Sequence, residues 1–243
     1  MNRKPAKPSV DAPAAQAPTV APGVPAASSR KPRKRTPGRR PTQDAADLRV
    51  QLLDAALACF VAKGIAATSL RDIAQRAGVT PALVHYYFGD KPRLQQAVVE
   101  ERLWPVMAQV HAGVQEAGEG VAGLVAAFVG GVVRAVAEHP WLPTLWVREI
   151  LCEGGALREL MIERVGPVLP RMLVERFAAA QRDGQLNPQL DPRLMVVSLM
   201  GLTMFPLASA PIWQSLSGAQ DLGAEEVQRH ASALLTHGLE LKA

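Results

Sequence analysis

Four side chains between residues 81 and 86 have the types and spacing of a DNA-contacting surface. Pro81, Ala82, His85 and Tyr86 fall on the free faces of a short predicted helix, because Val84 and Phe88 occupy its buried face. A helix of this kind can lie in the major groove while the helix before it crosses the phosphate backbone. The chemistry expected is therefore noncovalent contact with DNA. An ordinary αα-hairpin with the same spacing is the alternative.

Two short helices joined by a tight turn must position these side chains. Ser69 can cap the first helix, with Asp72 three positions later as a weak capping-box partner. Gly78 ends that helix, since glycine adopts the left-handed conformation without steric cost. Thr80 and Pro81 start the next one, because Thr is a good cap and Pro has its φ preset for the first helical position. Residues 69–88 are therefore predicted to form a helix-turn-helix motif.

The flanking segments favour a DNA-binding domain over an isolated hairpin. Upstream, Leu52, Ala56 and Phe60 form one face of an amphipathic helix that ends at Lys63-Gly64. Downstream, Gly89-Asp90-Lys91 opens another helix. The helices of this region can then share one small core.

These residues resemble the TetR/AcrR family of one-component transcriptional regulators. The resemblance rests on L-L-D-A-A-L-A-C-F-V-A-K-G (52–64), T-S-L-R-D-I-A (68–74), A-G-V-T-P-A-L-V-H-Y-Y-F (77–88) and Lys91 with Leu94. The sequence departs from it at Leu83, where many members have a polar residue, and at Gly89-Asp90-Lys91, where many have a small-polar-Lys run. The resemblance implies an all-α protein in which a three-helix DNA-binding head precedes a larger helical body for effector binding and dimerisation.

The resemblance also implies roles for individual residues. Pro81 and Ala82 match base-edge positions, where small apolar groups can meet a thymine methyl. His85 and Tyr86 match an aromatic pair that clamps the sugar-phosphate backbone, and Lys91 matches a lysine that meets a phosphate. Tyr87 reaches a phosphate or packs, and packing is favoured. The DNA-binding set predicted in full is Ser69, Arg71, Thr80, Pro81, Ala82, His85, Tyr86, Tyr87 and Lys91.

Composition and charge divide the chain into three regions. Apolar residues make up 48% of it, few are aromatic, and no sustained alternation of period two is present, so an all-α fold is expected. Residues 1–45 hold 10 Lys/Arg against 2 Asp/Glu, and the remaining 198 hold 17 against 20. The predicted regions are a disordered basic tail (1–45), the head (46–106) and the body (107–243). The tail either neutralises DNA phosphates or is a dispensable extension.

The body is expected to enclose an effector cavity and to form a homodimer. Long apolar side chains suit a lipophilic effector, and Arg148 or Glu149 could anchor a polar group of it or lie on a solvated face. The predicted pocket residues are Trp104, Met107, His111, Trp141, Trp146, Arg148, Glu149, Met161, Met172, Phe177, Met200 and Met204. By resemblance, the penultimate and last helices form the dimer interface, through Met200, Phe205, Val227, Ala231, Leu234 and Leu235.

Other classes of protein are less well supported by the sequence. Residues 194–220 carry no charge and are long enough to span a bilayer, but they contain several polar residues and two prolines, so burial against a second subunit is the simpler account. We find no nucleophile elbow, phosphate loop or acid pair, so no enzyme and no cofactor are expected. The histidines show no metal-ligand spacing. Cys59 and Cys152 are expected to be buried thiols of a cytoplasmic protein, and a redox pair is the alternative.

Overall fold

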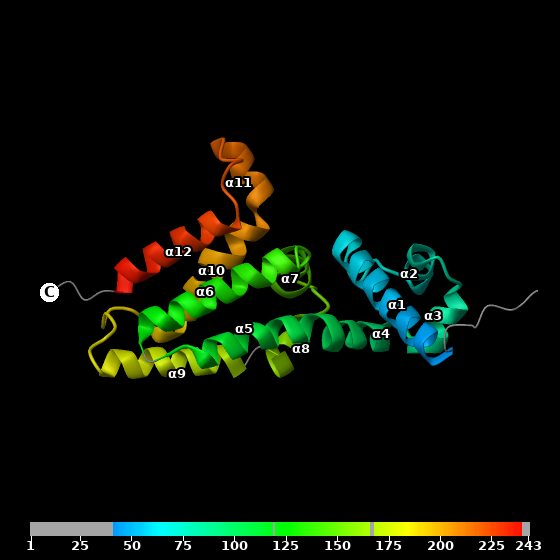
Figure 1. The fold of residues 1–243 in the computed structure, drawn as a ribbon, viewed down its shortest axis with the longest axis horizontal. Helices are drawn as coiled ribbons and strands as arrows, with labels where there is room; N and C mark the ends of the chain where they lie inside the picture. The colour runs from blue at the N-terminus through cyan, green and yellow to red at the C-terminus, as the bar shows by residue number, and fades with distance from the viewer. Residues whose placement is uncertain (1–40, 119, 166–167, 240–243) are drawn as a thin grey trace, which may run out of the picture. The chain divides into compact units, whose positions relative to one another are not determined.

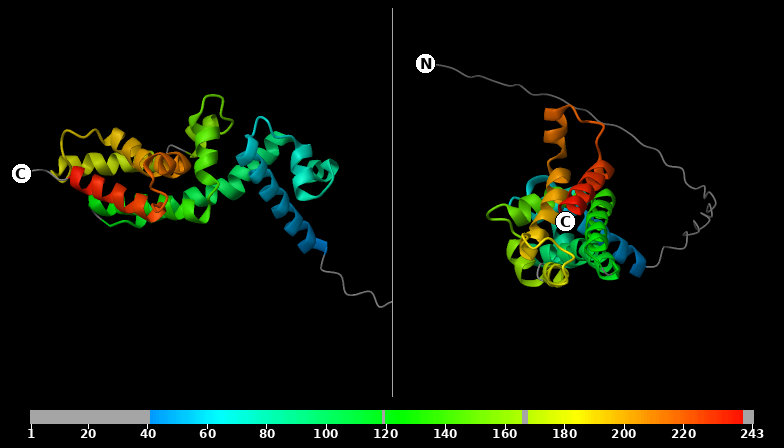
Figure 2. Two further views of the ribbon diagram at one scale, coloured as in Figure 1. Left: turned by 90° about the horizontal axis from the view of Figure 1, so that it is seen from above. Right: turned by 90° about the vertical axis from the view of Figure 1, so that its left-hand side faces the viewer.

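The computed structural model describes residues 41–118, 120–165 and 168–239. Within these ranges the chain consists of α-helices and π-helical turns, with no β-strand, which confirms the all-α prediction (Figures 1 and 2). Residues 1–40 of the predicted tail lie outside the described residues. Residues 41–45 were expected in the tail, but they begin the first helix, whose first residue is proline.

The first four helices form the head. They are α1 (Pro41–Lys63), α2 (Leu70–Ala77), α3 (Pro81–Phe88) and α4 (Lys91–Val98). Helix α1 packs against α2 and α4, and α2 packs against α3. The fully buried side chains at the centre are Leu52, Phe60, Ile73, Val84 and Leu94. The predicted amphipathic face of α1 is therefore the face that holds the head together.

The head continues into the body without a break. A π-helical turn, η1 (Val99–Leu103), joins α4 to α5 (Trp104–Glu116). Pro105 is the second residue of α5, and the π-turn lies directly before that helix. The backbone N–H of Trp104 donates to the backbone carbonyl of Val99, five residues earlier. Pro105 has no N–H to donate, and the carbonyl of Glu101 instead accepts from the Arg102 guanidinium at 3.0 Å.

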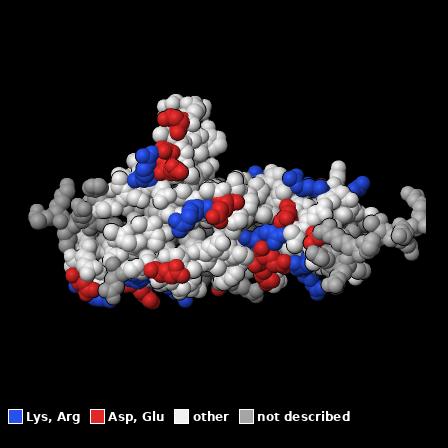
Figure 3. All heavy atoms as spheres, viewed as in Figure 1, with Lys and Arg blue, Asp and Glu red and all other residues white. Residues whose placement is uncertain are grey.

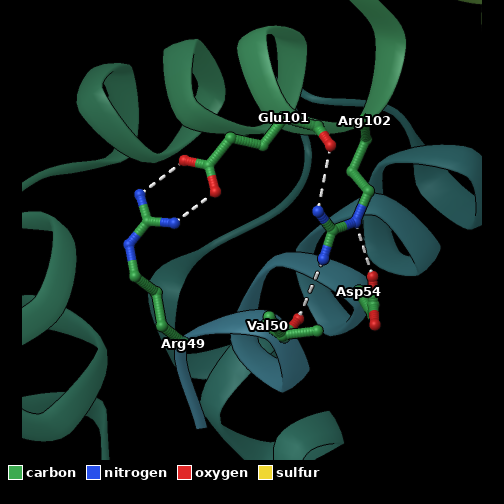
Figure 4. Close-up of polar contacts among 5 residues, drawn as sticks. All are labelled: Arg49, Val50, Asp54, Glu101 and Arg102. Atoms are coloured by element: carbon green, nitrogen blue, oxygen red, sulfur yellow. Dashed lines mark hydrogen bonds and ion pairs between the residues drawn. The ribbon is translucent and has the colours of Figure 1, made fainter. Parts of the chain in front are cut away.

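Ion pairs tie this π-turn to α1 (Figure 4). Arg49 of α1 makes a bidentate pair with Glu101, in which Nη2 lies 2.6 Å from Oε1. Arg102 bonds Asp54 at 2.7 Å and the Val50 carbonyl at 3.4 Å. Because both pairs join η1 to α1, the π-turn belongs structurally to the head.

The body is built around α6 (Val121–Glu138), which packs against α5, α7, α9, α10 and α12. After α6 come α7 (Leu142–Trp146), the π-turn η2 (Val147–Leu151), α8 (Arg158–Leu160), the π-turn η3 (Met161–Val165) and α9 (Val168–Arg182). Then α10 (Pro192–Ala208), α11 (Ala210–Ser217) and α12 (Ala224–Leu239) complete the described chain. Figures 1 and 2 show α12 lying along α6 and α10.

The uncharged region after residue 194 forms two helices that meet at a bend, and not one continuous helix. Helices α10 and α11 meet at 74°. Pro206 and Pro211 lie on either side of the bend, and the Ser209 hydroxyl donates to the Phe205 carbonyl at 2.7 Å. The sequence analysis missed α11. By length and composition, α6 and the bent pair could each cross a membrane, but half of that stretch of α6 is buried inside the body, which accounts for its apolar character.

Candidate DNA-binding site and effector cavity

Side-chain and backbone bonds fix both ends of α2. The Ser69 hydroxyl accepts from the Asp72 N–H at 3.2 Å, and the Ser69 N–H donates to the Asp72 carboxylate at 2.7 Å, so the capping box is complete. Lys63 lies 2.7 Å from the same carboxylate and, with Ser69, lowers the pKa of Asp72 well below its usual range. Gly78 has φ +69°, the left-handed conformation expected of it.

Helix α3 presents the predicted contact residues to solvent. Val84 and Phe88 are buried, and Pro81, Ala82 and His85 are exposed. Tyr86 is 81% exposed, and its ring stands edge-on to that of Tyr87 with centroids 5.5 Å apart. A large aromatic side chain so free of intramolecular packing has its face and hydroxyl available to a ligand.

The other predicted DNA contacts border this helix. Arg71 is exposed on α2. Thr80 occupies the N-cap position of α3 but makes no side-chain capping bond, in contrast to the expectation, and its side chain is exposed. Ser69 is also exposed, although its hydroxyl is already used by the capping box. Tyr87 is half-buried and packs on the core, which agrees with packing as its favoured role.

The start of α4 supplies cationic groups next to α3. Asp90 caps α4 by accepting from the Arg93 N–H at 2.9 Å. Lys91 Nζ donates to the Ala66 carbonyl at 2.9 Å. Because an ammonium has three N–H donors, this bond is compatible with a phosphate contact. Arg93 is exposed beside Lys91 and was missed by the sequence analysis, although two cations at the start of one helix are a usable signal. Figure 3 shows Lys and Arg interspersed with acidic residues over the head.

An apolar cavity of about 230 Å³ lies within the body. Five of the predicted pocket residues line it: Met107, Trp146, Met161, Met200 and Met204. The sequence analysis missed the other residues of the lining, which are Val106, Val110, Phe128, Val132, Ala135, Leu142, Leu169, Pro170, Leu173 and Val196. These are ordinary core residue types, so only their position in three dimensions distinguishes them. The residues that the structure places around the cavity include no charged side chain.

The structure places seven predicted pocket residues outside this lining. Phe177 is fully buried in the core, and Met172 is half-buried beside the lining residue Leu173. Trp104 is about half exposed, and Trp141 packs against His139 with ring centroids 5.5 Å apart. The remaining three are His111, whose Nε2 is buried without a hydrogen-bond partner among the described residues, and Arg148 and Glu149, which bond the head.

The predicted dimer residues divide between the inside and the outside of the body. Val227, Ala231 and Leu235 of α12 are buried within the chain, because this face of α12 packs on α6 and α10. Met200 lines the cavity. Only Phe205 and Leu234 are exposed. Leu194 and Val197, which the sequence analysis missed, are also exposed and lie on α10 at helical spacing from Phe205.

The cysteines differ from the expectation at one position. Cys59 is buried, and this burial raises the pKa of its thiol, whereas Cys152 is exposed in the loop after η2. The described residues contain no group of three or more His, Cys, Asp or Glu side chains arranged to hold a metal ion.

Comparison with known proteins identifies the head. A family model described as "Bacterial regulatory proteins, tetR family" matches residues 52–98. The HTH-type transcriptional regulator TtgR of Pseudomonas putida is 39% identical over 62 residues, which make up 26% of this chain and 30% of TtgR. The sequence likeness to the curated relatives therefore spans about a third of their length.

Two solved structures share the fold over most of the chain. The ketosteroid transcriptional regulator KstR2 of Mycobacterium tuberculosis has a TM-score of 0.65 at 20% identity, over 80% of this chain and 95% of that one. The transcriptional regulator FadR of Bacillus subtilis, solved with stearoyl-CoA, has a TM-score of 0.59 at 17% identity, over 79% and 99%. Residues 52–98 therefore carry the sequence signature of the tetR family of bacterial regulatory proteins, and the rest of the described chain shares the fold of these two regulators.

Proposed function

We propose that this chain is a ligand-responsive transcriptional repressor that binds a palindromic operator as a homodimer and works in the cytoplasm. The observation that carries the proposal is the exposed face of α3, where Pro81, Ala82, His85 and Tyr86 stand free on a helix anchored by Val84 and Phe88. Pro81 and Ala82 would meet base edges. His85 and Tyr86 would hold the sugar-phosphate backbone, together with Arg71, Thr80 and Lys91.

A homodimer would place two such helices in successive major grooves, about 34 Å apart. The exposed apolar stripe of Leu194, Val197 and Phe205 on α10, with Leu234 on α12, supports this assembly. Repression is the simpler mode of action, because occupying a promoter requires no further protein contact.

The effector would be an uncharged, apolar molecule held in the body cavity. An engineered apolar cavity of roughly 150 Å³ in another protein binds benzene, so about 230 Å³ is enough for a somewhat larger molecule. FadR was solved with stearoyl-CoA, but the described residues that line the cavity of this chain include no cation to pair with a CoA phosphate. We therefore do not extend that ligand to this protein.

Selection of bound sequences from random duplex DNA tests the proposal, with the full-length chain and with molar mass measured by light scattering on the same sample. We expect an enriched palindrome bound by one or two dimers. Salt-sensitive binding with no enriched motif would contradict operator recognition and would assign the DNA affinity to general electrostatic attraction.

A further inference from the structure

Glu149 is a buried carboxylate that joins the body to the head. It is 4% exposed and lies in the π-turn η2. Its Oε1 accepts from the Ile65 N–H at 2.9 Å, and its Oε2 accepts from the Ala156 N–H at 3.1 Å. Ile65 belongs to the turn between α1 and α2 of the head. One side chain therefore bonds backbone donors on both sides of the junction.

The chain makes room for this carboxylate with two glycines. Gly64 has φ +87°, and a Cβ at that position would lie 3.1 Å from Glu149 Oε1. A Cβ on Gly155 would lie 2.4 Å from the Glu149 carbonyl oxygen, a distance that requires the backbone to shift. Arg148 adds a second link, since its guanidinium donates to the Val61 carbonyl at 2.8 Å. The junction is thus closely fitted around η2.

Burying a carboxylate costs free energy, so an apolar contact would hold the two domains together more favourably. A charged group taken out of water loses hydration that backbone hydrogen bonds only partly replace. Leu145 and Leu157 already pack beside Phe60 and Ile65 of the head, and they supply apolar adhesion at the same place. What Glu149 adds is a directional bond, whose strength depends on the position of η2 to within a few tenths of an ångström.

The same segment forms part of the cavity wall. Leu142 and Trp146 of α7 line the cavity, and Glu149 follows Trp146 by less than one helical turn. Met161, on the other side of the loop, lines it as well. Trp146 directly precedes η2, so a ligand that displaces the Trp146 backbone also moves η2. Single π-helical turns are rare and are frequently found at functional sites.

We propose that Glu149 is the positioning residue through which occupancy of the body cavity is communicated to the DNA-binding head. The inference rests on the proposed function. In the empty protein Glu149 holds Ile65, and with it the turn from which α2 and α3 depart. A ligand at Trp146 shifts η2, breaks the Glu149–Ile65 bond and releases the head from the position that fits DNA.

The test uses N-phenyl-1-naphthylamine, an uncharged fluorescent probe, and the full-length protein. Hydrogen exchange of the Ile65 amide should accelerate at least fivefold when the probe saturates the wild-type protein. In Glu149→Gln the exchange should already be fast and should change less than twofold with the probe, because the two backbone donors bond different carboxylate oxygens and Gln places an NH2 donor at one of these positions. Glu153→Gln, an exposed change in the same loop, is the matched control and should behave as wild type.

A second readout measures coupling to DNA. With a duplex obtained by selection, the wild-type protein should bind the probe at least fivefold more weakly in the presence of DNA, within the usual range of allosteric coupling. Glu149→Gln should reduce that factor below twofold and should retain or raise the probe affinity of the DNA-free protein, because the probe no longer has to break this bond. This retained affinity shows that the variant is folded.

Three results would overturn the inference: a probe that does not bind, a bound probe that leaves Ile65 exchange unchanged, or full coupling in Glu149→Gln. A protein that selects no DNA motif would contradict the proposed function instead. The exchange experiment contains no DNA, so the two failures are distinguishable.

Discussion

The ion pair between Arg49 and Glu101 should hold η1 to α1 with a measurable coupling energy. Both side chains are 38% exposed, so solvent and salt screen the attraction, and the contribution falls in the range of about 0–1 kcal/mol found for surface pairs. The bidentate geometry places it toward the upper end, at about 0.5–1 kcal/mol. For a described domain of this size, about 1 kcal/mol corresponds to roughly 2–4 °C in Tm.

A double-mutant cycle isolates this term. Arg49→Gln, Glu101→Gln and the double variant are compared with wild type by thermal denaturation. Arg49 also lies 5.2 Å from the Phe88 ring centroid, but the loss of that contact is common to both arms of the cycle and cancels. Raising NaCl from about 0.15 to about 1 M shortens the Debye length from about 8 to about 3 Å and should reduce the coupling by about half.

The coupling should also depend on pH. The hydrogen bond from Arg49 lowers the pKa of Glu101 in the folded protein. A lowered folded-state pKa means that the pair stabilises the fold fully above the unfolded pKa of about 4.3 and loses this effect as pH falls through the folded value. A coupling energy below about 0.2 kcal/mol at pH 7, or one that salt and acid leave unchanged, would refute an electrostatic clamp and assign the junction to packing alone.

Further expectations concern DNA binding, assembly and the tail. Tyr86→Ala should weaken binding to selected and random DNA alike, by about five- to tenfold, with Tm unchanged because the side chain is 81% exposed. Ala82→Ser should alter the selected motif, and equal losses on selected and random duplexes would contradict base contact by Ala82. Phe205→Lys should shift the molar mass from dimer to monomer in light scattering, whereas an unchanged mass would place the interface elsewhere. Deletion of residues 1–40 should flatten the plot of log K against log salt if the tail neutralises phosphates, and an unchanged slope would show that it does not.

The head could be predicted almost entirely from sequence because its signals are local. A capping box, a left-handed glycine and an N-terminal proline each act within four residues, and Ser69, Gly78 and Pro81 adopt the expected positions. Thr80 is the exception, since it has the cap position without the cap bond. The assignment of DNA contacts depends on which side chains α3 leaves exposed, and helical periodicity is sufficient for that.

The cavity and the junction could not be predicted in the same way because they depend on contacts distant in sequence. Glu149 bonds Ile65 across 84 positions, and a Glu next to an Arg in an apolar helix gives no indication of its partner. Residues such as Val132 and Ala135 become cavity lining only when α6 packs beside α5 and α10. Sequence reasoning selected large flexible side chains, but the lining consists mostly of ordinary core residues.

Helix α10 shows why an apolar pattern does not identify what covers each face. Its inward side places Met200 and Met204 at the cavity, and its outward side leaves Leu194, Val197 and Phe205 exposed. Both sides are apolar, so the periodicity that separates a buried face from a solvated one is absent, and the sequence analysis assigned Met200 to the pocket and to the dimer interface alike. Helix α12 has a polar side, yet its apolar residues Ala231 and Leu235 face α6 rather than a partner. A helix that is apolar on all sides must therefore be buried on both faces. For α10 the chain itself buries the inward face, and the proposed second subunit would bury the outward face.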